Sequence, residues 1–240
     1  MVTEKFYVGY TEINKEFKLS NVALLNYFQD ITTIHGKLAG DSLKDTDYGW
    51  FLTAYHVKVF NRPDYENWFN LSTWSRDIKG FIASREFEIK DNQRNLQVSA
   101  ISNWVRINKH TQKIERVSPE IASAYGKENN SATFSDSWIA KIQQPEKFDF
   151  ETKITIDRNY IDIHKHVNNV SYLKLAELVL PESVYNNSES NEFDILYKKA
   201  IRCGETITCG YTETNEYYIV TMMSNDKSEL CAIVRLYKNK

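Results

Sequence analysis

The stretch Asn21-Val-Ala-Leu-Leu-Asn-Tyr-Phe-Gln-Asp-Ile-Thr-Thr-Ile-His35 carries the pattern that decides the fold class. Its apolar side chains recur at a spacing of three residues, at Val22, Leu25, Phe28 and Ile31. This spacing predicts an amphipathic helix, with Ser20 as its N-cap and Gly36 just past its end. Such a helix needs an apolar surface to cover its buried face, and a curved antiparallel sheet supplies one. The stretch therefore predicts an α+β unit in which a sheet wraps around one long helix.

Four strand patterns follow the helix, at residues 50–60, 68–76, 84–90 and 96–107. In the last of them Leu96, Val98 and Ala100 alternate with polar residues, which is typical of a half-buried antiparallel strand. From about residue 118 the periodicity is lost, and the polar stretch 127–137 indicates a connection between two domains.

The second half of the chain repeats the first. Residues 154–160 resemble a strand, and 168–180 resemble a helix that Pro181 ends. Further strand patterns lie near residues 193–201, 206–213, 217–224 and 230–237. An offset of 148 residues aligns Asn21 with Asn169. The predicted fold class is therefore α+β, with two units in tandem, each a long helix wrapped by a curved antiparallel sheet. The expected ranges are 1–117 for the N-terminal unit, 118–149 for a linker and 150–240 for the C-terminal unit.

The composition of the chain excludes several classes of function. The chain has 240 residues, of which 42% are hydrophobic and 26% charged, as in an ordinary globular protein. A net charge of −2 gives no bulk attraction to nucleic acid or to an anionic membrane, and no run near 18 apolar residues predicts a membrane span. The first residues lack the apolar stretch of a signal peptide, so a cytoplasmic location is expected. Cys203, Cys209 and Cys231 have no metal-ligand spacing and are predicted to be buried thiols in strands.

The densest cluster of reactive groups in the chain is Asp162-Ile-His164-Lys-His166-Val-Asn168-Asn169-Val-Ser-Tyr172, directly before the second predicted helix. A carboxylate, two imidazoles and two carboxamides lie within eight residues. The matching stretch of the first half, residues 14–21, has no such titrating pair. Because only one copy of the repeat carries these groups, they are not required merely to build the fold. His35, His56 and His110 are isolated in sequence and are expected to be packed or solvated.

The location suggests acyl chemistry. The amides of Val167 and Asn168, at a helix start, are candidates for holding an oxyanion. Asp162 and His166 are candidates for orienting and deprotonating a water molecule. The alternative is purely structural, with Asn168 as an N-cap beside a solvated histidine-rich turn. A metal site at His164 and His166 would need a third ligand, and the sequence offers none nearby.

His166-Val-Asn-Asn-Val-Ser-Tyr172 resembles the H-V-N-N-x-x-Y motif of the acyl-acyl carrier protein (acyl-ACP) thioesterases, a family of the hot-dog superfamily. The similarity extends from about residue 5 to residue 238, through the stretches 24–29, 72–76, 84–89 and 102–105. The resemblance implies a tandem double hot-dog fold with an acyl tunnel beside a helix. It also implies hydrolysis of a fatty acyl thioester of acyl carrier protein, releasing free fatty acid without a cofactor or metal.

Carried over by this resemblance, the catalytic residues are Asp162, His164 and His166. The substrate-binding residues are Val167, Asn168, Asn169 and Tyr172. His164 stands where the family has Asn, and imidazole can keep a hydrogen-bond donor there. The family's downstream catalytic Glu falls on Ala200, while Glu205 belongs to the following turn. Losing a general base costs on the order of 10²–10⁴-fold in rate.

Two other functions stay open. An acyl-coenzyme A thioesterase would share the fold, but acyl carrier protein is acidic and its recognition favours a basic patch. The candidate cations are Lys165, Lys198, Lys199 and Arg202, which can equally be a solvated strand edge. A non-catalytic acyl-binding or regulatory protein would explain the departures at His164 and Ala200. Aromatic residues near the helices can line a tunnel or simply pack the core, namely Trp50, Phe51, Tyr160 and Tyr172. A homodimer through a sheet edge is possible.

Overall fold

Helix α1, Asn21–Leu38, is the helix that the opening pattern predicts. The Ser20 hydroxyl accepts a hydrogen bond from the Ala23 amide at 3.2 Å, so it is the N-cap. Leu25, Phe28 and Ile31 are fully buried on one face of the helix. Burial of that face, rather than helix propensity alone, holds the helix in place.

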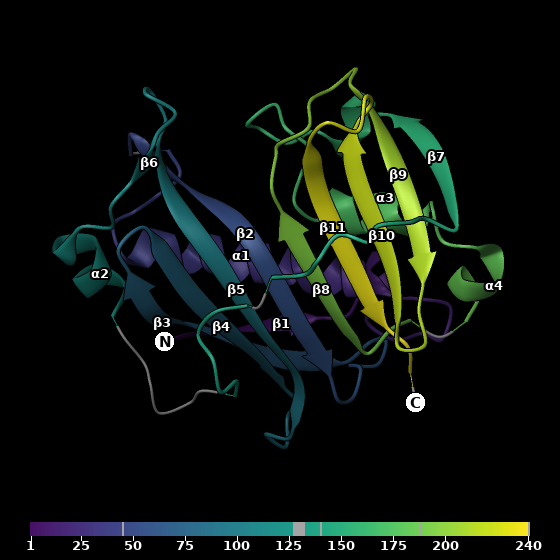
Figure 1. Cartoon of the computed structure of the whole chain (residues 1–240). Helices are drawn as coiled ribbons and strands as arrows, with labels where there is room; N and C mark the ends of the chain where they lie inside the picture. Colours follow the sequence, from purple (N-terminus) through teal and green to yellow (C-terminus); the bar gives the residue numbers. More distant parts are fainter. Residues whose placement is uncertain (45, 127–132, 140, 188, 240) are drawn as a thin grey trace. The chain divides into compact units, whose positions relative to one another are not determined.

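The computed structural model describes residues 1–44, 46–126, 133–139, 141–187 and 189–239. The chain divides into two compact units, Met1–Ile139 and Ala140–Lys240 (Figure 1). Each unit is an antiparallel sheet with a helix against it, so the predicted tandem α+β architecture is confirmed.

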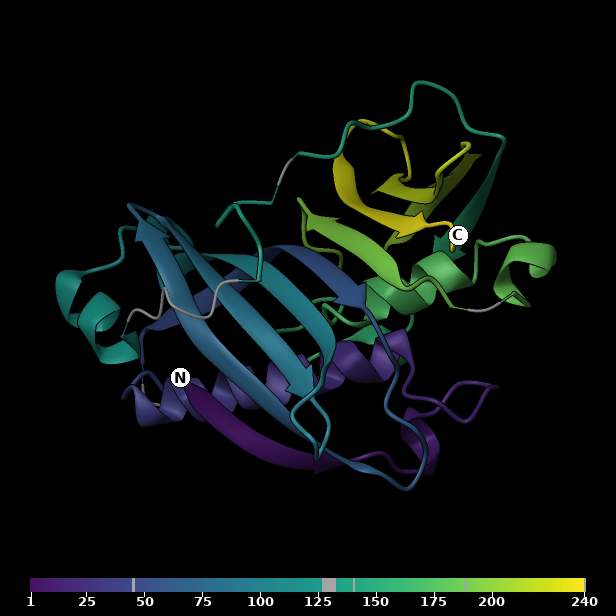
Figure 2. The same ribbon diagram turned by 90° about the horizontal axis from the view of Figure 1, so that it is seen from below.

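The sheet of the first unit has the strand order β1-β3-β4-β5-β2, with the short β6 paired to β5. Its strands are β1 (Val2–Tyr7), β2 (Tyr48–Val59), β3 (Trp68–Lys79), β4 (Ile82–Lys90), β5 (Leu96–Asn108) and β6 (Ile114–Glu115). A 3₁₀ turn, η1 (Tyr10–Glu12), follows β1. Figure 2 shows α1 lying along one face of this sheet. Phe28 of α1 stacks on Phe87 of β4 with ring centroids 4.5 Å apart, so helix and sheet share one core.

The segment after β6 packs on the first unit. It begins with helix α2, Pro119–Tyr125, capped by the Ser118 hydroxyl. Arg76 of β3 then donates hydrogen bonds to the carbonyls of Ser135 and Asp136, at 3.2 and 3.0 Å. The polar residues 127–132 lie outside the described residues. The linker boundaries expected from the sequence, 118 and 149, stay a prediction.

The second unit has the strand order β8-β11-β10-β9-β7. Its strands are β7 (Phe150–Thr155), β8 (Glu192–Tyr197), β9 (Thr206–Glu213), β10 (Tyr217–Ser224) and β11 (Leu230–Tyr237). Its helical elements are η2 (Arg158–Tyr160), α3 (Ser171–Glu177) and α4 (Glu182–Tyr185), and α3 lies behind the strands in Figure 1. The strand predicted at 154–160 instead ends at residue 155, because Asp157 caps the 3₁₀ turn η2. The helix predicted at 168–180 is shorter at both ends.

Two of the three cysteines are buried in strands, as predicted: Cys209 in β9 and Cys231 in β11. The prediction is wrong for Cys203, which is exposed in the loop after β8. Within the part of the chain that the structure describes, no three His, Cys, Asp or Glu side chains are grouped to hold a metal ion. Nor does any described helix combine the length and apolarity needed to cross a bilayer.

Candidate active site

The reactive cluster of the second unit forms a tight hairpin. The Asp162 amide donates to the His166 carbonyl at 2.9 Å, and the Lys165 amide donates to the Asp162 carbonyl at 3.0 Å. Lys165 adopts a left-handed conformation with φ 63°, as the third loop residue of such a hairpin requires. The Asp162 carboxylate accepts from the His164 amide at 2.8 Å. The turn therefore fixes Asp162 and His166 across from each other at its base.

The first unit contains the same turn, 148 residues earlier. The Asn14 amide donates to the Lys18 carbonyl at 2.8 Å, and the Phe17 amide donates to the Asn14 carbonyl at 3.1 Å. Phe17 is left-handed with φ 57°, and the Asn14 side chain accepts from the Glu16 amide at 3.0 Å. The predicted repeat is confirmed at the level of individual hydrogen bonds. Asp162 takes the place of Asn14, and His166 that of Lys18.

The amides of Val167 and Asn168 are already used within the fold. They donate to the carbonyls of Ile201 and Tyr160, both at 2.8 Å. The equivalent bonds in the first unit, from Leu19 to Pro63 and from Ser20 to Glu12, are both 2.9 Å long. Since the unit without the reactive cluster makes the same bonds, they belong to the scaffold. The expectation that these two amides hold an oxyanion is therefore wrong for this conformation.

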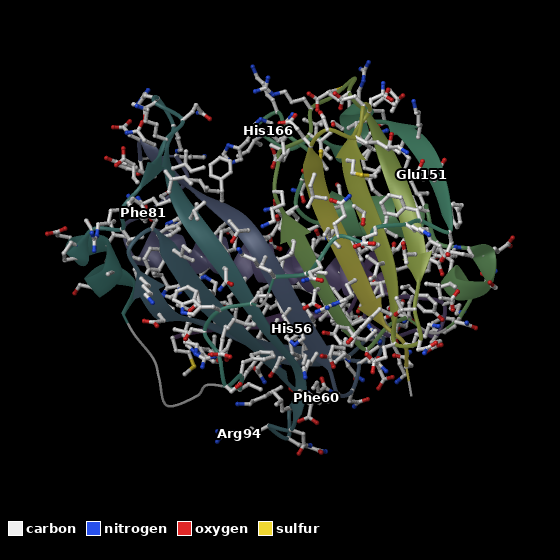
Figure 3. The ribbon with its side chains drawn as sticks, in the orientation of Figure 1. His56, Phe60, Phe81, Arg94, Glu151 and His166 are labelled. Atoms are coloured by element: carbon white, nitrogen blue, oxygen red, sulfur yellow. The ribbon has the colours of Figure 1, made fainter. Side chains whose placement is uncertain are left out.

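The three groups expected to be catalytic differ in exposure. Asp162 and His166 are half-buried, and His164 is exposed at the hairpin tip. Figure 3 shows His166 on the loops beyond the end of β8. No hydrogen bond joins the carboxylate of Asp162 to the ring of His166, both of which lie in the described part of the chain. The structure thus brings the acid and the imidazole onto one turn without coupling them directly.

The remaining residues of the cluster, Asn168, Asn169 and Tyr172, make contacts in the segment that follows the hairpin. The Asn168 side chain accepts from the Val170 amide at 2.9 Å, so it stabilises the turn that leads into α3. The Asn169 carbonyl accepts from the Tyr197 hydroxyl at 3.0 Å. Tyr172 is only 3% exposed, and its hydroxyl lies 3.5 Å from the Lys199 carbonyl. Burial raises the pKa of Tyr172, so its phenol is neutral near pH 7.

The loop after β8, residues 198–205, lies against the hairpin through the bond from Val167 to Ile201. Ala200 is exposed in this loop, directly beside Ile201. Glu205 accepts from the Arg202 amide at 2.9 Å and so belongs to its own turn. No carboxylate therefore stands at the position that the family resemblance assigns to a catalytic Glu.

The same loop and the hairpin tip carry positive charge. Lys165, Lys198 and Arg202 are exposed, and within the described ranges none of them pairs with a carboxylate. Lys199 is different, because it forms an ion pair with Glu229. Three uncompensated cations thus border the Asp162–His166 turn.

Comparison with known proteins identifies the family. Residues 1–125 match the model of the acyl-ACP thioesterase N-terminal domain, and residues 142–236 match that of the C-terminal domain. The chain belongs to the acyl-ACP thioesterase family. Among its curated relatives, oleoyl-acyl carrier protein thioesterase 2 of Arabidopsis thaliana is 22% identical to this chain. The match covers 98% of this chain and 72% of the relative. This chain spans a smaller share of other curated relatives. It covers 58% of the length of the oleoyl-acyl carrier protein thioesterase of Coriandrum sativum.

Solved structures of the family share the fold. The 12:0-ACP thioesterase of Umbellularia californica superposes with a TM-score of 0.86 at 19% identity, over 100% of this chain and 97% of the other. An acyl-ACP thioesterase of Bacteroides thetaiotaomicron gives 0.80 at 19% identity, over 99% and 97%. The predicted double hot-dog fold is thereby confirmed.

One buried polar cluster was not predicted from the sequence. A cavity inside the first unit is lined by Arg85, Tyr125 and Trp50 among others, and His35 contacts Arg85. The available signal was the two-residue spacing in β4, which places Arg85 on the same face as the core residues Phe87 and Ile89. An arginine at an apolar position of a strand marks a buried charge.

Proposed function

We propose that this chain hydrolyses the thioester of an acyl-acyl carrier protein and releases a free fatty acid. The observation that carries the proposal is the duplicated turn, in which only the copy of the second unit has a carboxylate and an imidazole at its base. Membership of a thioesterase family supports the same reaction class.

In the proposed mechanism His166 acts as general base. It takes a proton from a water molecule whose oxygen attacks the thioester carbonyl carbon. The C–S bond then breaks, and the leaving thiolate recovers the proton from the imidazolium. Asp162 orients the water or the imidazole through Oδ2, because its Oδ1 already accepts from the His164 amide. His164 provides an auxiliary hydrogen bond from the hairpin tip.

The oxyanion requires a donor other than the two amides used by the scaffold. The N–H of Asn169 comes next along the chain and has no acceptor among the described residues. We assign it this role in the proposal. The Asn168 carbonyl of the same peptide accepts from the Ser171 amide at 2.8 Å, and the Asn169 carbonyl accepts from the Tyr197 hydroxyl at 3.0 Å, so the local backbone is held in place. Preorganised donors of this kind stabilise the charge that develops in the transition state.

The exposed cations favour acyl carrier protein over coenzyme A as the thiol component. Lys165, Lys198 and Arg202 surround the turn, and a broad patch of this sign suits a strongly acidic protein partner. A second candidate function, non-catalytic acyl binding, is favoured by one observation, the alanine at position 200 beside the turn.

A hydrolysis panel tests the proposal. Acyl-acyl carrier protein and acyl-coenzyme A thioesters with matched chains of graded length are compared with wild type and with Arg202→Glu. We expect higher kcat/KM for the carrier-protein series, and charge reversal should raise KM for that series only. Equal preference for both thiols would refute the choice of partner. Bound fatty acid with no hydrolysis of either series would instead establish the acyl-binding function.

A further inference from the structure

Strand β7 is an open edge of the second unit's sheet. It pairs with β9 on one side, and within the described residues no strand of this unit pairs with its other side. Figure 1 draws it as the outermost strand of this sheet, and Figure 3 shows Glu151 on it. Ile154 is half-buried, and the other five residues of the strand are exposed. An edge of this kind presents backbone groups that can pair with another chain.

The register of the β7–β9 pair shows which backbone groups face the open side. The pairing is regular throughout β7, and the Ile156 amide continues it by donating to the Glu205 carbonyl at 2.9 Å. Backbone groups alternate in direction along an antiparallel strand. The even-numbered residues of β7 therefore bond to β9, whereas Glu151 and Lys153 direct their N–H and C=O groups to the open side.

A second copy of the strand can pair with this edge about a twofold axis perpendicular to the sheet. Residues that lie opposite each other then share a face, so both have odd numbers or both have even numbers. With the axis at Thr152, Glu151 lies opposite Lys153 of the second copy, and Lys153 lies opposite Glu151 of the second copy. Phe150 and Ile154 oppose each other in the same way, and Thr152 meets its own counterpart.

These pairs are of the kinds that stabilise antiparallel sheets, namely opposite charges, an aromatic beside a β-branched side chain, and Thr beside Thr. Phe150 is 39% exposed, although its ring stacks on that of Tyr211 with centroids 5.0 Å apart. Tyr211 and Cys209 are buried on the same face of β9. The apolar face of the sheet thus continues to the open edge, where Ile154 of a second copy covers Phe150.

The charged face of β7 also has room for a partner. The Glu151 carboxylate accepts from Nζ of Lys227 at 2.7 and 2.5 Å. Lys153 forms no ion pair with a carboxylate among the described residues. A carboxylate has about four lone-pair sites, so Glu151 can accept from a second ammonium group. Lys153 of a second copy supplies that group in the register centred on Thr152.

Other symmetric pairings of the outer strands lack this match. Moving the axis to Lys153 sets two lysines opposite each other. Strand β1, which ends the sheet of the first unit, has two symmetric registers that pair five residues. One of them sets Glu4 opposite Glu4, and the other sets Lys5 opposite Lys5. Like charges directly opposite each other are destabilising, so the self-complementary edge is β7 in a single register.

We propose that two copies of this chain associate through β7, as an antiparallel pair with Thr152 on the twofold axis. Both copies use the same strand, so the interface closes on itself and association stops at a dimer. The inference does not rest on the proposed function, because the strand pair uses none of the residues of the candidate active site.

Sedimentation equilibrium of the full chain tests the charged pairs. Wild type should form a reversible dimer with a Kd below about 1 mM. Lys153→Glu sets acidic side chains opposite each other twice, and Glu151→Lys does the same with basic ones. Each variant should therefore raise Kd by about tenfold or more. Lys5→Glu makes the same charge change on β1, so it is the matched control and should dimerise as wild type does.

A mixture of the two charge variants separates loss of the interface from loss of the fold. In an equimolar mixture of Lys153→Glu and Glu151→Lys, every charged pair between unlike copies is attractive. The mixture should associate about tenfold or more tightly than either variant alone. Misfolded variants would not recover association in this way.

Disulfide cross-linking tests the register. Opposite residues that exchange backbone hydrogen bonds have Cα atoms about 5.5 Å apart, which suits a disulfide. Cys203→Ser removes the exposed thiol. In that background, Glu151→Cys and Lys153→Cys should cross-link when mixed in oxidised glutathione, and neither should cross-link alone.

Four results would overturn the proposal. Wild type stays a monomer up to about 1 mM, or neither charge reversal raises Kd. The mixture of charge variants fails to recover association, or Lys5→Glu weakens the dimer as much as Lys153→Glu does. Cross-linking of Lys153→Cys to itself would equally refute the register, since it places Lys153 on the axis.

Discussion

Asp162 and Asn14 accept the same backbone hydrogen bond at the same place in two copies of one turn. The turn explains why each position holds a residue with a side-chain oxygen three bonds from Cα. It does not explain why one copy has a carboxylate and the other a carboxamide. The two copies also differ across the turn, where one has His166 and the other has Lys18. At the scale of single residues, the candidate catalytic groups are therefore those that differ between the two copies.

Asn168 and Ser20 provide a matched pair for testing the support of the turn. The Ser20 side chain caps α1, and the Asn168 side chain accepts from the Val170 amide in the turn before α3. Replacing either by Ala removes one such hydrogen bond and should lower the free energy of unfolding by about 1 kcal/mol. Only Asn168→Ala should also lower turnover, because Asn168 precedes the proposed oxyanion donor. Urea denaturation and acyl-acyl carrier protein hydrolysis measure the two effects. Normal turnover in Asn168→Ala would contradict a supporting role.

Among the elements, those with strong periodicity were predictable from sequence. The α1 pattern, and alternation such as that of β5 (Leu96–Asn108), gave the right element type within a few residues. β7 (Phe150–Thr155) was misplaced, because the apolar residues Ile154 and Ile156 continue the strand pattern into a loop. The backbone acceptors of the hairpin were not predictable, since the Ile201 carbonyl lies more than thirty residues from Val167. Nor could sequence show that Arg85 contacts His35 and Thr73 and pairs with no carboxylate among the described residues, because pairing is a property of the packed core.

Phe148, in the segment before β7, packs closely against β9. A Cβ atom added at Gly210 of β9 would lie only 2.4 Å from the ring of Phe148. Gly210→Ala should therefore destabilise the chain by about 1–3 kcal/mol through overpacking. Adding Phe148→Ala should recover part of that loss, so the two changes will be non-additive. Additive changes in the free energy of unfolding would show that Phe148 does not pack on β9.

At the scale of the whole molecule, the two units carry different groups of polar residues. The second unit has the acid–imidazole turn, and the first has a buried cation facing a cavity. Each unit also has a group whose shifted pKa couples stability to pH. Burial and the nearby Arg85 lower the pKa of His35 to about 4 from 6.5. Burial and Glu189 raise the pKa of Glu177 to about 7 from 4.5.

These shifts have opposite consequences. The folded state holds His35 neutral, so stability is lost as the pH falls from 6.5 towards 4. The folded state favours protonated Glu177, so stability is lost as the pH rises from 4.5 through 7. Glu177→Gln should therefore gain melting temperature relative to wild type between pH 5 and pH 8. The exposed Glu146→Gln is the control. A difference independent of pH would contradict the raised pKa of Glu177.

The most direct test of the account exchanges the two turn residues, as Asp162→Asn and Asn14→Asp. Asn14 shows that a carboxamide can hold this turn, so both variants should unfold within about 0.5 kcal/mol of wild type. Steady-state hydrolysis of an acyl-acyl carrier protein should then fall by about 10²–10⁴-fold in Asp162→Asn and stay unchanged in Asn14→Asp. Wild-type kcat in a folded Asp162→Asn variant would show that the carboxylate serves only the turn.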